Sequence, residues 1–247
     1  MRRRSRPSGK FLPKGLTIIH EDNDILVVDK PPDLLTIGTD TEKRRTAYFL
    51  LTDYVRKGAA KSRKRIFIVH RLDRETSGIL IFAKSEEAKF YLQSHWKETK
   101  KTYLAVVHGH CDRKSETITT YLAENQAHFV YSTSDTSKGK LSQTAYRVLK
   151  QTKDLALLEV DLLTGRKHQI RVHLTGIGHP VVGDQRYGKE NSAHKRLALH
   201  ARSISFQHPS SGKRLTIETK VPVYFNQLVG SVDHKATGAA TGSDTDI

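Results

Sequence analysis

Short runs of apolar and β-branched residues, separated by polar segments and turns, recur along most of this 247-residue chain. Such residues favour β-strands, and the runs are as long as single strands. The runs outnumber the helical patterns and do not alternate with them as a doubly wound fold requires. We therefore expect an α+β fold with a mixed, mainly antiparallel sheet flanked by helices and loops. The expected strands lie at residues 25–28, 66–69, 79–82, 101–107, 117–122, 142–149 and 155–163.

Helical patterns occur in three places between or after these strands. In residues 46–55 the apolar residues recur at helical spacing. Ser85 can cap a second helix, with Glu86 and Glu87 near its N-terminus, where negative charge is favourable. Residues 167–174 (KHQIRVHL) fit both the alternation of a strand and one turn of a helix, and we favour the helix.

The two ends of the chain differ in composition from its middle. Residues 1–14 contain six Lys and Arg and no acid, which predicts a flexible basic arm. Residues 231–247 are small and polar, too poor in apolar groups to offset the entropy of ordering, so we expect a disordered tail. One folded unit is expected over residues 15–230.

The charge of the chain points to a polyanionic partner. Lys and Arg number 42 against 26 Asp and Glu, a formal charge of +16, which favours nucleic acid or an anionic membrane surface. No stretch approaches the ~20 apolar residues that span a bilayer, so we expect no membrane insertion. The single cysteine, Cys111, excludes an internal disulfide and fits a cytoplasmic location. The 13 histidines lack the spacing of zinc ligands, and we expect no metal site.

Asp73 is the carboxylate in HRLDRETSG (residues 70–78), a polar segment between two expected strands. A loop on a rigid sheet can hold such a side chain out towards a substrate. The neighbouring Arg71 and Arg74 favour its ionised form, which suits a nucleophile or a base. Local composition alone, however, favours a structural role for Asp73, as the cap of a turn or the partner of these arginines.

HRLDRETSG closely resembles the signature of the RluA-type pseudouridine synthases, and further resemblances follow in order along the chain. DILVVDKPP (24–32) looks like the family's opening strand, and KTYLAVVHG (101–109) looks like its tyrosine-bearing strand. TGRKHQIRVHL (164–174), GHPVVGDQRYG (178–188) and LALHARSISFQHPSSG (197–212) look like three later motifs. The resemblance implies the family's catalytic fold, with its active site in a basic cleft.

The resemblance also implies roles for individual residues. Asp73 takes the place of the essential aspartate that attacks the target nucleotide. Tyr103 takes the place of the tyrosine that packs against the flipped uracil. Arg171 takes the place of the basic residue that pairs with the catalytic carboxylate, with Arg166 and Lys167 as competing candidates. Without the motifs, Tyr103 would be a strand aromatic in the core and Arg171 a surface ion-pair partner.

Other residues are assigned to RNA or to the pocket wall. Arg71 matches an arginine that helps to fill the gap left in the RNA stack, and Leu197 and Leu199 match apolar residues of the pocket wall. A charge run is usually a solvated loop, but the run at residues 56–65 precedes the strand that leads to Asp73, so we expect it to hold phosphates near the flipped nucleotide. The expected RNA contacts are Arg71, Arg74, Arg56, Lys57, Lys61, Arg63, Lys64, Arg65, Arg166, Lys167 and His168.

The implied reaction is the isomerisation of uridine to pseudouridine. The base must detach, rotate and rejoin the sugar, so the nucleotide has to leave the stack. No redox, hydrolytic or metal step is required, and we expect no cofactor. The expected partner is RNA, either 23S ribosomal RNA or transfer RNA, bound by a monomer. One alternative is a non-catalytic RNA-binding protein with the same fold. A metal-dependent nuclease is disfavoured, because its metal ions need clustered carboxylates, whereas the motifs of this chain contain mostly isolated ones.

Overall fold

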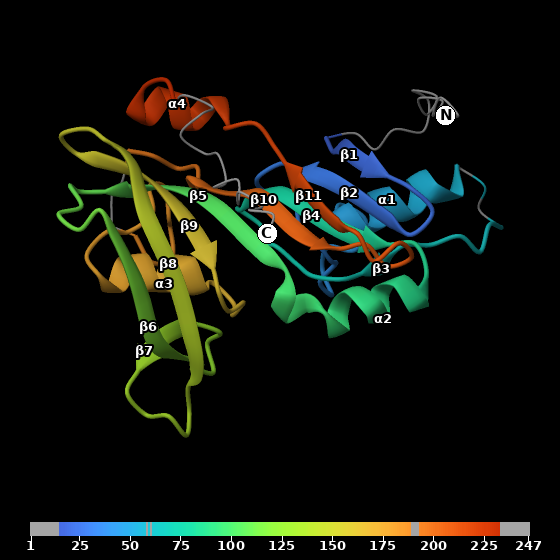
Figure 1. Ribbon diagram of the computed structural model, residues 1–247, viewed down its shortest axis with the longest axis horizontal. Helices are drawn as coiled ribbons and strands as arrows, with labels where there is room; N and C mark the ends of the chain where they lie inside the picture. The colour runs from blue at the N-terminus through green and yellow to red at the C-terminus, as the bar shows by residue number, and fades with distance from the viewer. Residues whose placement is uncertain (1–14, 58, 60, 189–192, 233–247) are drawn as a thin grey trace, which may run out of the picture.

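The computed structural model describes residues 15–57, 59, 61–188 and 193–232 (Figure 1). The expected arm at residues 1–14 and most of the expected tail lie outside the described residues. The strands are β1 (Thr17–Glu21), β2 (Ile25–Lys30), β3 (Phe67–Ile68), β4 (Ser77–Ala83), β5 (Lys100–His108), β6 (Ser115–Glu124), β7 (Val130–Thr133), β8 (Lys140–Gln151), β9 (Leu155–Leu162), β10 (Leu199–Gln207) and β11 (Arg214–Glu218). The helices are α1 (Ala47–Arg56), α2 (Glu86–Ser94), the 3₁₀ helix η2 (Trp96–Glu98), α3 (Gln169–Gly176) and α4 (Val223–Val229).

One mixed sheet joins these strands, in the order β1-β2-β4-β10-β5-β9-β8-β6-β7, with β11 beside β10 and β3 beside β4. The pairing of β4 with β10 is parallel, and the other strand pairs within the described residues are antiparallel. The expected α+β architecture with a mainly antiparallel sheet is therefore confirmed. β10 lies between β4 and β5, so it joins the N-terminal strands to the strands that follow α2.

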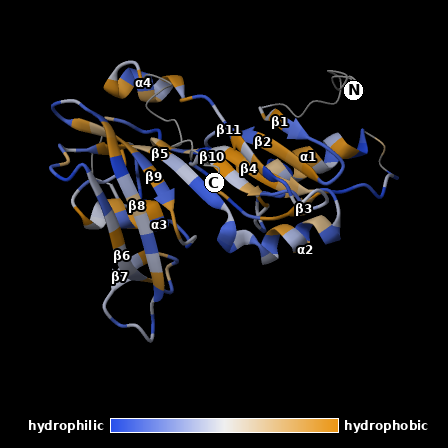
Figure 2. Cartoon of the chain, in the orientation of Figure 1, coloured by the Kyte–Doolittle hydropathy of each residue, from blue (hydrophilic) through white to orange (hydrophobic). Residues whose placement is uncertain are grey.

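The alternation of side chains along β2 and β4 divides the core between the two faces of the sheet. Leu26 and Leu80 belong to a large apolar cluster that includes Leu51 of α1. Their neighbours Ile25 and Ile79 point the other way, into a second cluster that includes residues of α2. Figure 2 shows the apolar residues concentrated in these strands. Both faces of this part of the sheet are therefore covered, and residues 25–28 and 79–82 are apolar throughout.

The first two helices begin where the sequence indicates. Thr46 Oγ1 accepts a hydrogen bond from the Phe49 N–H at the start of α1, and Ser85 Oγ accepts one from the Ala88 N–H at the start of α2. These side chains satisfy backbone donors that have no partner within the helix. The described part of the chain contains no helix long and apolar enough to cross a membrane.

Several elements differ from the sequence-based expectation. The strand expected at residues 66–69 is only the two-residue β3. The helix favoured for residues 167–174 is present as α3, but it begins at Gln169, so Lys167 and His168 precede it. Strands β1, β7, β10 and β11 and helix α4 were not expected.

Candidate active site

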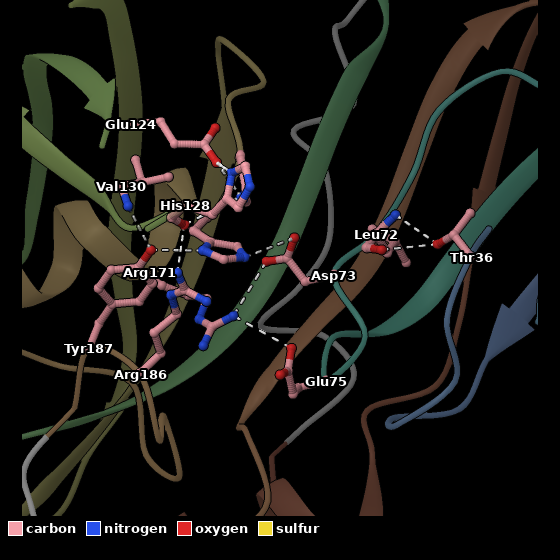
Figure 3. A network of polar contacts seen from close by, with 12 residues as sticks. Thr36, Leu72, Asp73, Glu75, Glu124, His128, Val130, Arg171, Arg186 and Tyr187 are labelled. Atoms are coloured by element: carbon pink, nitrogen blue, oxygen red, sulfur yellow. Dashed lines mark hydrogen bonds and ion pairs between the residues drawn. The ribbon is translucent and has the colours of Figure 1, made fainter. Parts of the chain in front are cut away.

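Asp73 lies in the connection between β3 and β4, and hydrogen bonds hold this loop on both sides of it. Thr36 Oγ1 accepts from the Leu72 N–H at 3.2 Å and donates to the Leu72 carbonyl at 2.9 Å (Figure 3). On the other side, Lys30 Nζ donates to the Arg74 carbonyl at 3.0 Å. The loop backbone is thus fixed, while the Asp73 side chain remains 21% exposed.

Lys30 is a completely buried cation beneath this loop. Its ammonium donates to three backbone carbonyls, those of Pro31, Leu34 and Arg74. Burial lowers the pKa of Lys30 to about 8, although nearby carboxylates, including Asp33 and Asp73, oppose the shift. The ammonium therefore stays largely protonated at neutral pH, and it joins the end of β2 to the Asp73 loop.

Arg171, on α3, faces Asp73 but is held by a different carboxylate. Its Nε and Nη2 donate to the two oxygens of Asp184 at 2.8 and 2.7 Å. The remaining Nη1 lies 3.6 Å from Asp73 Oδ2 and 3.6 Å from Glu75 Oε2 (Figure 3). Burial would lower the pKa of Arg171, but the hydrogen bonds and charge of Asp184 outweigh it and raise the pKa. The resemblance implies that Arg171 pairs with Asp73, whereas its hydrogen-bonded partner in the structure is Asp184.

Asp184 belongs to a turn that wraps around its own carboxylate. Both Arg186 and Tyr187 donate their backbone N–H groups to Asp184 Oδ1, at 2.9 and 3.0 Å. Burial would raise the pKa of Asp184, but its bonds to Arg171 and to these N–H groups lower it. The motif at residues 178–188 therefore supplies the support that orients Arg171. The signal for this support in the sequence is the occurrence of an acid, Asp184, shortly before an aromatic residue, Tyr187, within that motif.

His168 lies on the other side of the Asp73 carboxylate. Its Nε2 is 3.8 Å from Asp73 Oδ1, and its Nδ1 is 2.8 Å from the hydroxyl of Tyr187. The residue was assigned to RNA from the sequence, and the structure places it against Asp73 and buries most of its ring. Burial lowers the pKa of His168, although the Asp73 carboxylate opposes the shift.

Tyr103, on β5, lines the same pocket as Asp73, His168 and Arg171. The pocket has a volume of about 360 Å³. Burial raises the pKa of the Tyr103 hydroxyl, and the charge of Asp73 raises it further, so the hydroxyl is protonated at neutral pH. Leu199 also lines the pocket, whereas Leu197 is buried away from it.

Several of the sequence-assigned cations reach this region. Arg71, Arg166 and Lys167 line the pocket, together with two residues that the sequence did not single out for the site, Trp96 and Lys101. A second hollow of about 330 Å³ adjoins the first and shares Asp73 with it. Arg74 lies in this second hollow, with its Nη1 3.3 Å from Glu42 Oε2.

The charged run at residues 56–65 does not lie beside Asp73. It precedes Phe67, which pairs with Ala83 at the end of β4, whereas Asp73 precedes Ser77 at the start of that strand. At ~3.3 Å per residue, the two ends of β4 are about 20 Å apart. The cations of this run instead border a separate pocket of about 790 Å³, lined by Lys57, Arg63, Lys64 and Arg65 among others.

A group of possible metal ligands lies at the same end of β4 as Ala83. One ligand atom from each of Asp22, Asp24 and His208 falls within 4.8 Å of the others. These side chains are already bonded to one another or to their surroundings, with His208 Nε2 3.0 Å from Asp22 Oδ2. They join the turn after β1 to the residue that follows β10.

Comparisons with known proteins give a consistent result. A family model described as RNA pseudouridylate synthase matches residues 24–175. Ribosomal large subunit pseudouridine synthase C of Vibrio cholerae is 34% identical over 222 residues, covering 86% of this chain and 68% of that protein. An uncharacterized RNA pseudouridine synthase of Mycoplasma pneumoniae is 35% identical over 230 residues, covering 89% and 71%.

Two solved human structures are similar in fold. RNA pseudouridylate synthase domain containing 1 has a TM-score of 0.67 at 27% identity, covering 87% of this chain and 86% of that one. RNA pseudouridylate synthase domain containing 4 has a TM-score of 0.73 at 23% identity, covering 88% and 94%.

Proposed function

The chain belongs to the RNA pseudouridylate synthase family, whose members are isomerases, and on that premise we propose that it converts a uridine of large-subunit ribosomal RNA to pseudouridine, with Asp73 as the reacting carboxylate. The observation that carries the proposal is the meeting of Asp73, Tyr103 and Arg171 in one pocket, although they come from distant segments of the chain. A protein that only binds RNA has no need of this combination.

The pocket is suited to a single flipped base. Its volume of about 360 Å³ lies near the lower limit of small-molecule sites, ~300 Å³. A uridine that leaves the stack can place its ring against Tyr103, and stacking on an aromatic face contributes about 1–3 kcal/mol per base. Leu199 supplies an apolar wall. The base is thereby held while its bond to the ribose is exchanged from N1 to C5.

Asp73 supplies the group that reacts. Its carboxylate can form a transient bond with the nucleotide or remove a sugar proton, and either route divides one difficult step into easier ones. Arg171 holds the orientation of the carboxylate from 3.6 Å away. The Tyr103 hydroxyl, protonated at neutral pH because burial raises its pKa, is placed to assist proton movement at C5.

RNA is held around the pocket by basic side chains. Arg71, Arg166 and Lys167 line its rim and can contact phosphates on either side of the flipped nucleotide. Loops are favoured targets, because their bases cost less to unstack than bases in a duplex. Ribosomal RNA is preferred over transfer RNA because a relative that is 34% identical is named as a ribosomal large subunit enzyme.

The deciding experiment is to incubate unmodified large-subunit ribosomal RNA and transfer RNA with the protein and map pseudouridine by chemical labelling and primer extension. We expect modification of ribosomal RNA by the wild type, none by Asp73→Asn, and RNA binding by both. Asp154→Asn, at an exposed aspartate on the turn before β9, is the matched control and should remain active.

Each other outcome contradicts part of the proposal. Equal modification by the wild type and Asp73→Asn excludes Asp73 as the reacting group. Modification of transfer RNA alone contradicts the proposal that ribosomal RNA is the target. Tight binding of both RNAs without modification favours the non-catalytic RNA-binding alternative.

A further inference from the structure

His168 has an unusual backbone conformation for a residue with a side chain. Its φ is 55°, in the left-handed region, immediately before α3 begins at Gln169. Residues other than glycine rarely adopt this conformation, and Asn, Asp and His are the main exceptions. Backbone strain of this kind is concentrated at sites where a side chain has to be aimed. Here it aims the imidazole between Tyr187 and Asp73.

The contacts of Tyr187 determine which ring nitrogen of His168 carries the proton. The Tyr187 oxygen accepts a hydrogen bond from the Val130 N–H at 3.2 Å (Figure 3). Its own O–H has one acceptor among its contacts in the described residues, His168 Nδ1 at 2.8 Å. A buried hydroxyl donates wherever an acceptor is available. The Tyr187 O–H therefore donates to Nδ1, and the proton of a neutral imidazole is left on Nε2.

The surroundings keep the imidazole neutral. Burial is the largest influence and lowers the pKa of His168 below its ordinary value of 6.5. Asp73 acts in the opposite direction, whereas three cations lower the pKa further: Arg171 from α3, Arg186 from the turn after it, and Lys167 next in sequence. The Nε2 that faces Asp73 thus carries a hydrogen but no net charge at neutral pH.

We propose that His168 is a positioning residue, held by Tyr187 as the Nε2–H tautomer, that orients the Asp73 carboxylate for reaction. The inference rests on the proposed function, because it assumes that Asp73 reacts. Arg171 Nη1 faces Oδ2 at 3.6 Å and His168 Nε2 faces Oδ1 at 3.8 Å, so each oxygen has its own neighbour. Both distances exceed a hydrogen bond, and such contacts often tighten only when substrate enters.

A neutral donor has an advantage over a second cation at this position. Another positive charge beside Asp73 would attract its carboxylate oxygens more strongly and make them weaker nucleophiles. A neutral N–H fixes the direction of one carboxylate oxygen without adding charge. The arrangement requires no net transfer of a proton along Val130, Tyr187 and His168.

The tautomer is tested first, in the absence of RNA. Nitrogen-15 NMR of protein labelled at histidine distinguishes a protonated ring nitrogen from an unprotonated one, and the His168 signals are assigned by their loss in His168→Asn. We expect Nε2 protonated and Nδ1 unprotonated in the wild type at neutral pH, and loss of this preference in Tyr187→Phe. Tyr146→Phe, which removes a hydroxyl that contacts Glu116, is the matched control and should keep the wild-type tautomer. A proton on Nδ1 in the wild type, or an unchanged tautomer in Tyr187→Phe, overturns the proposal.

The role in positioning is tested by single-turnover rates at saturating ribosomal RNA, together with the Kd for RNA. His168→Asn tolerates the left-handed backbone but is too short to reach Asp73, so we expect a roughly tenfold slower rate, the scale seen when supporting groups behind a site are removed. His168→Gln, whose amide N–H reaches further, should restore part of the rate. The Kd should not change in either variant. An unchanged rate in His168→Asn, or a weaker Kd at an unchanged rate, overturns the proposal, and the second result returns His168 to RNA binding.

The link between Tyr187 and His168 is tested by a double-mutant cycle. Tyr187→Phe should slow the wild type by roughly tenfold yet have little further effect in His168→Asn. If the two substitutions slowed the rate of the double variant by the product of their separate effects, the link between Tyr187 and His168 would be overturned. Should Tyr187→Phe fail to fold, because the Val130 N–H loses its partner, the two His168 variants still decide the positioning role. Because the tautomer is measured without RNA, a wild type that formed no pseudouridine would refute the proposed function while the NMR result stood or fell separately.

Discussion

At the scale of single residues, the orientation of Arg171 depends on a carboxylate that does not face the pocket. Asp184 is fully buried, and Arg171 is 3% exposed. A buried pair of this kind contributes little net stability compared with apolar residues, but removing one partner leaves the other charge without compensation. The pair occupies Nε and Nη2 of Arg171 and leaves Nη1 facing Asp73.

Replacing Asp184 with Asn should consequently affect both stability and rate. We expect the free energy of unfolding in urea to fall by about 3–5 kcal/mol, the usual cost of breaking a buried ion pair. The single-turnover rate should fall as well, because Arg171 is no longer held. Asp154→Asn serves as the exposed control and should change neither quantity. A variant as stable as the wild type would contradict the assigned role of Asp184.

At the scale of elements, β4 and β10 approach each other at Gly78, which ends the HRLDRETSG motif. Gly78 has a φ of 110°, and a Cβ at this position would collide with the backbone of Ala201. The glycine therefore permits the parallel pairing that supports the Asp73 loop.

The variant Gly78→Ala tests this approach. Strained backbone positions cost about 1–3 kcal/mol, and here the added Cβ would also collide with the backbone of Ala201. We therefore expect the free energy of unfolding in urea to fall by at least about 2 kcal/mol. Gly176→Ala, at the end of α3, has open space around its Cβ and should be as stable as the wild type or more so. Equal stability of the Gly78 and Gly176 variants would show that β4 and β10 can separate without cost.

The charged run at residues 56–65 gives a prediction that separates binding from catalysis. If Arg63 and Lys64 each contact a phosphate, changing both to Gln should reduce the salt dependence of RNA binding. Each contact on a single strand adds roughly 0.7 to the slope of the logarithm of the binding constant against the logarithm of the salt concentration. The single-turnover rate at saturating RNA should not change, because this run lies about 20 Å along β4 from Asp73. An unchanged slope would show that the run is only a solvated loop.

The sequence predicted elements where local patterns and the final fold agree. Residues 25–28 and 79–82 are apolar throughout, and α1 and α2 carry capping residues, so all four could be located. β10 alternates His200 and Arg202 with smaller residues, and it becomes a strand because β4, β5 and β11 pair with it. Pairing partners distant in sequence are not encoded in local periodicity.

Contacts between distant segments also limited what could be predicted about the site. The motifs placed Asp73, Tyr103 and Arg171 in the site, because each lies in a segment that resembles the family. The contact between Arg171 and Asp184 could not be inferred, since it depends on how the turn after α3 folds back. The run at residues 56–65 precedes β3, but it lies far from Asp73, because β3 and β4 run antiparallel and β3 pairs with the far end of β4.

At the scale of the whole molecule, the cluster of Asp22, Asp24 and His208 joins the hairpin of β1 and β2 to the residue that follows β10. Burial would raise the pKa of Asp22, but hydrogen bonds from His20, His208 and the backbone outweigh it and lower the pKa to about 2. A lowered pKa means that the folded state favours the carboxylate more than the unfolded state does. The resulting stability is present above pH ~4 and is lost as the pH falls towards 2.

Asp22→Asn should therefore destabilise the protein at neutral pH and much less near pH 2. At pH 7 we expect the free energy of unfolding of Asp22→Asn to be about 1–2 kcal/mol lower than that of the wild type, after allowance for screening by solvent. Urea unfolding between pH 2 and pH 7 measures it, with Asp154→Asn as the control. A difference that remained constant over this range would contradict the assignment.

The position of β10 also determines when the protein becomes complete during its synthesis. β1 to β4 can pair with one another as they emerge from the ribosome, and β5 to β9 can do the same. Among the residues that the structure describes, β10 alone joins the two groups in the sheet, and it is made after both of them. Asp73 belongs to the earlier group, and Arg171 follows the later one. Leu199 of β10 lines the pocket together with Asp73 and Tyr103, so the pocket is assembled only once β10 has paired with β4 and β5.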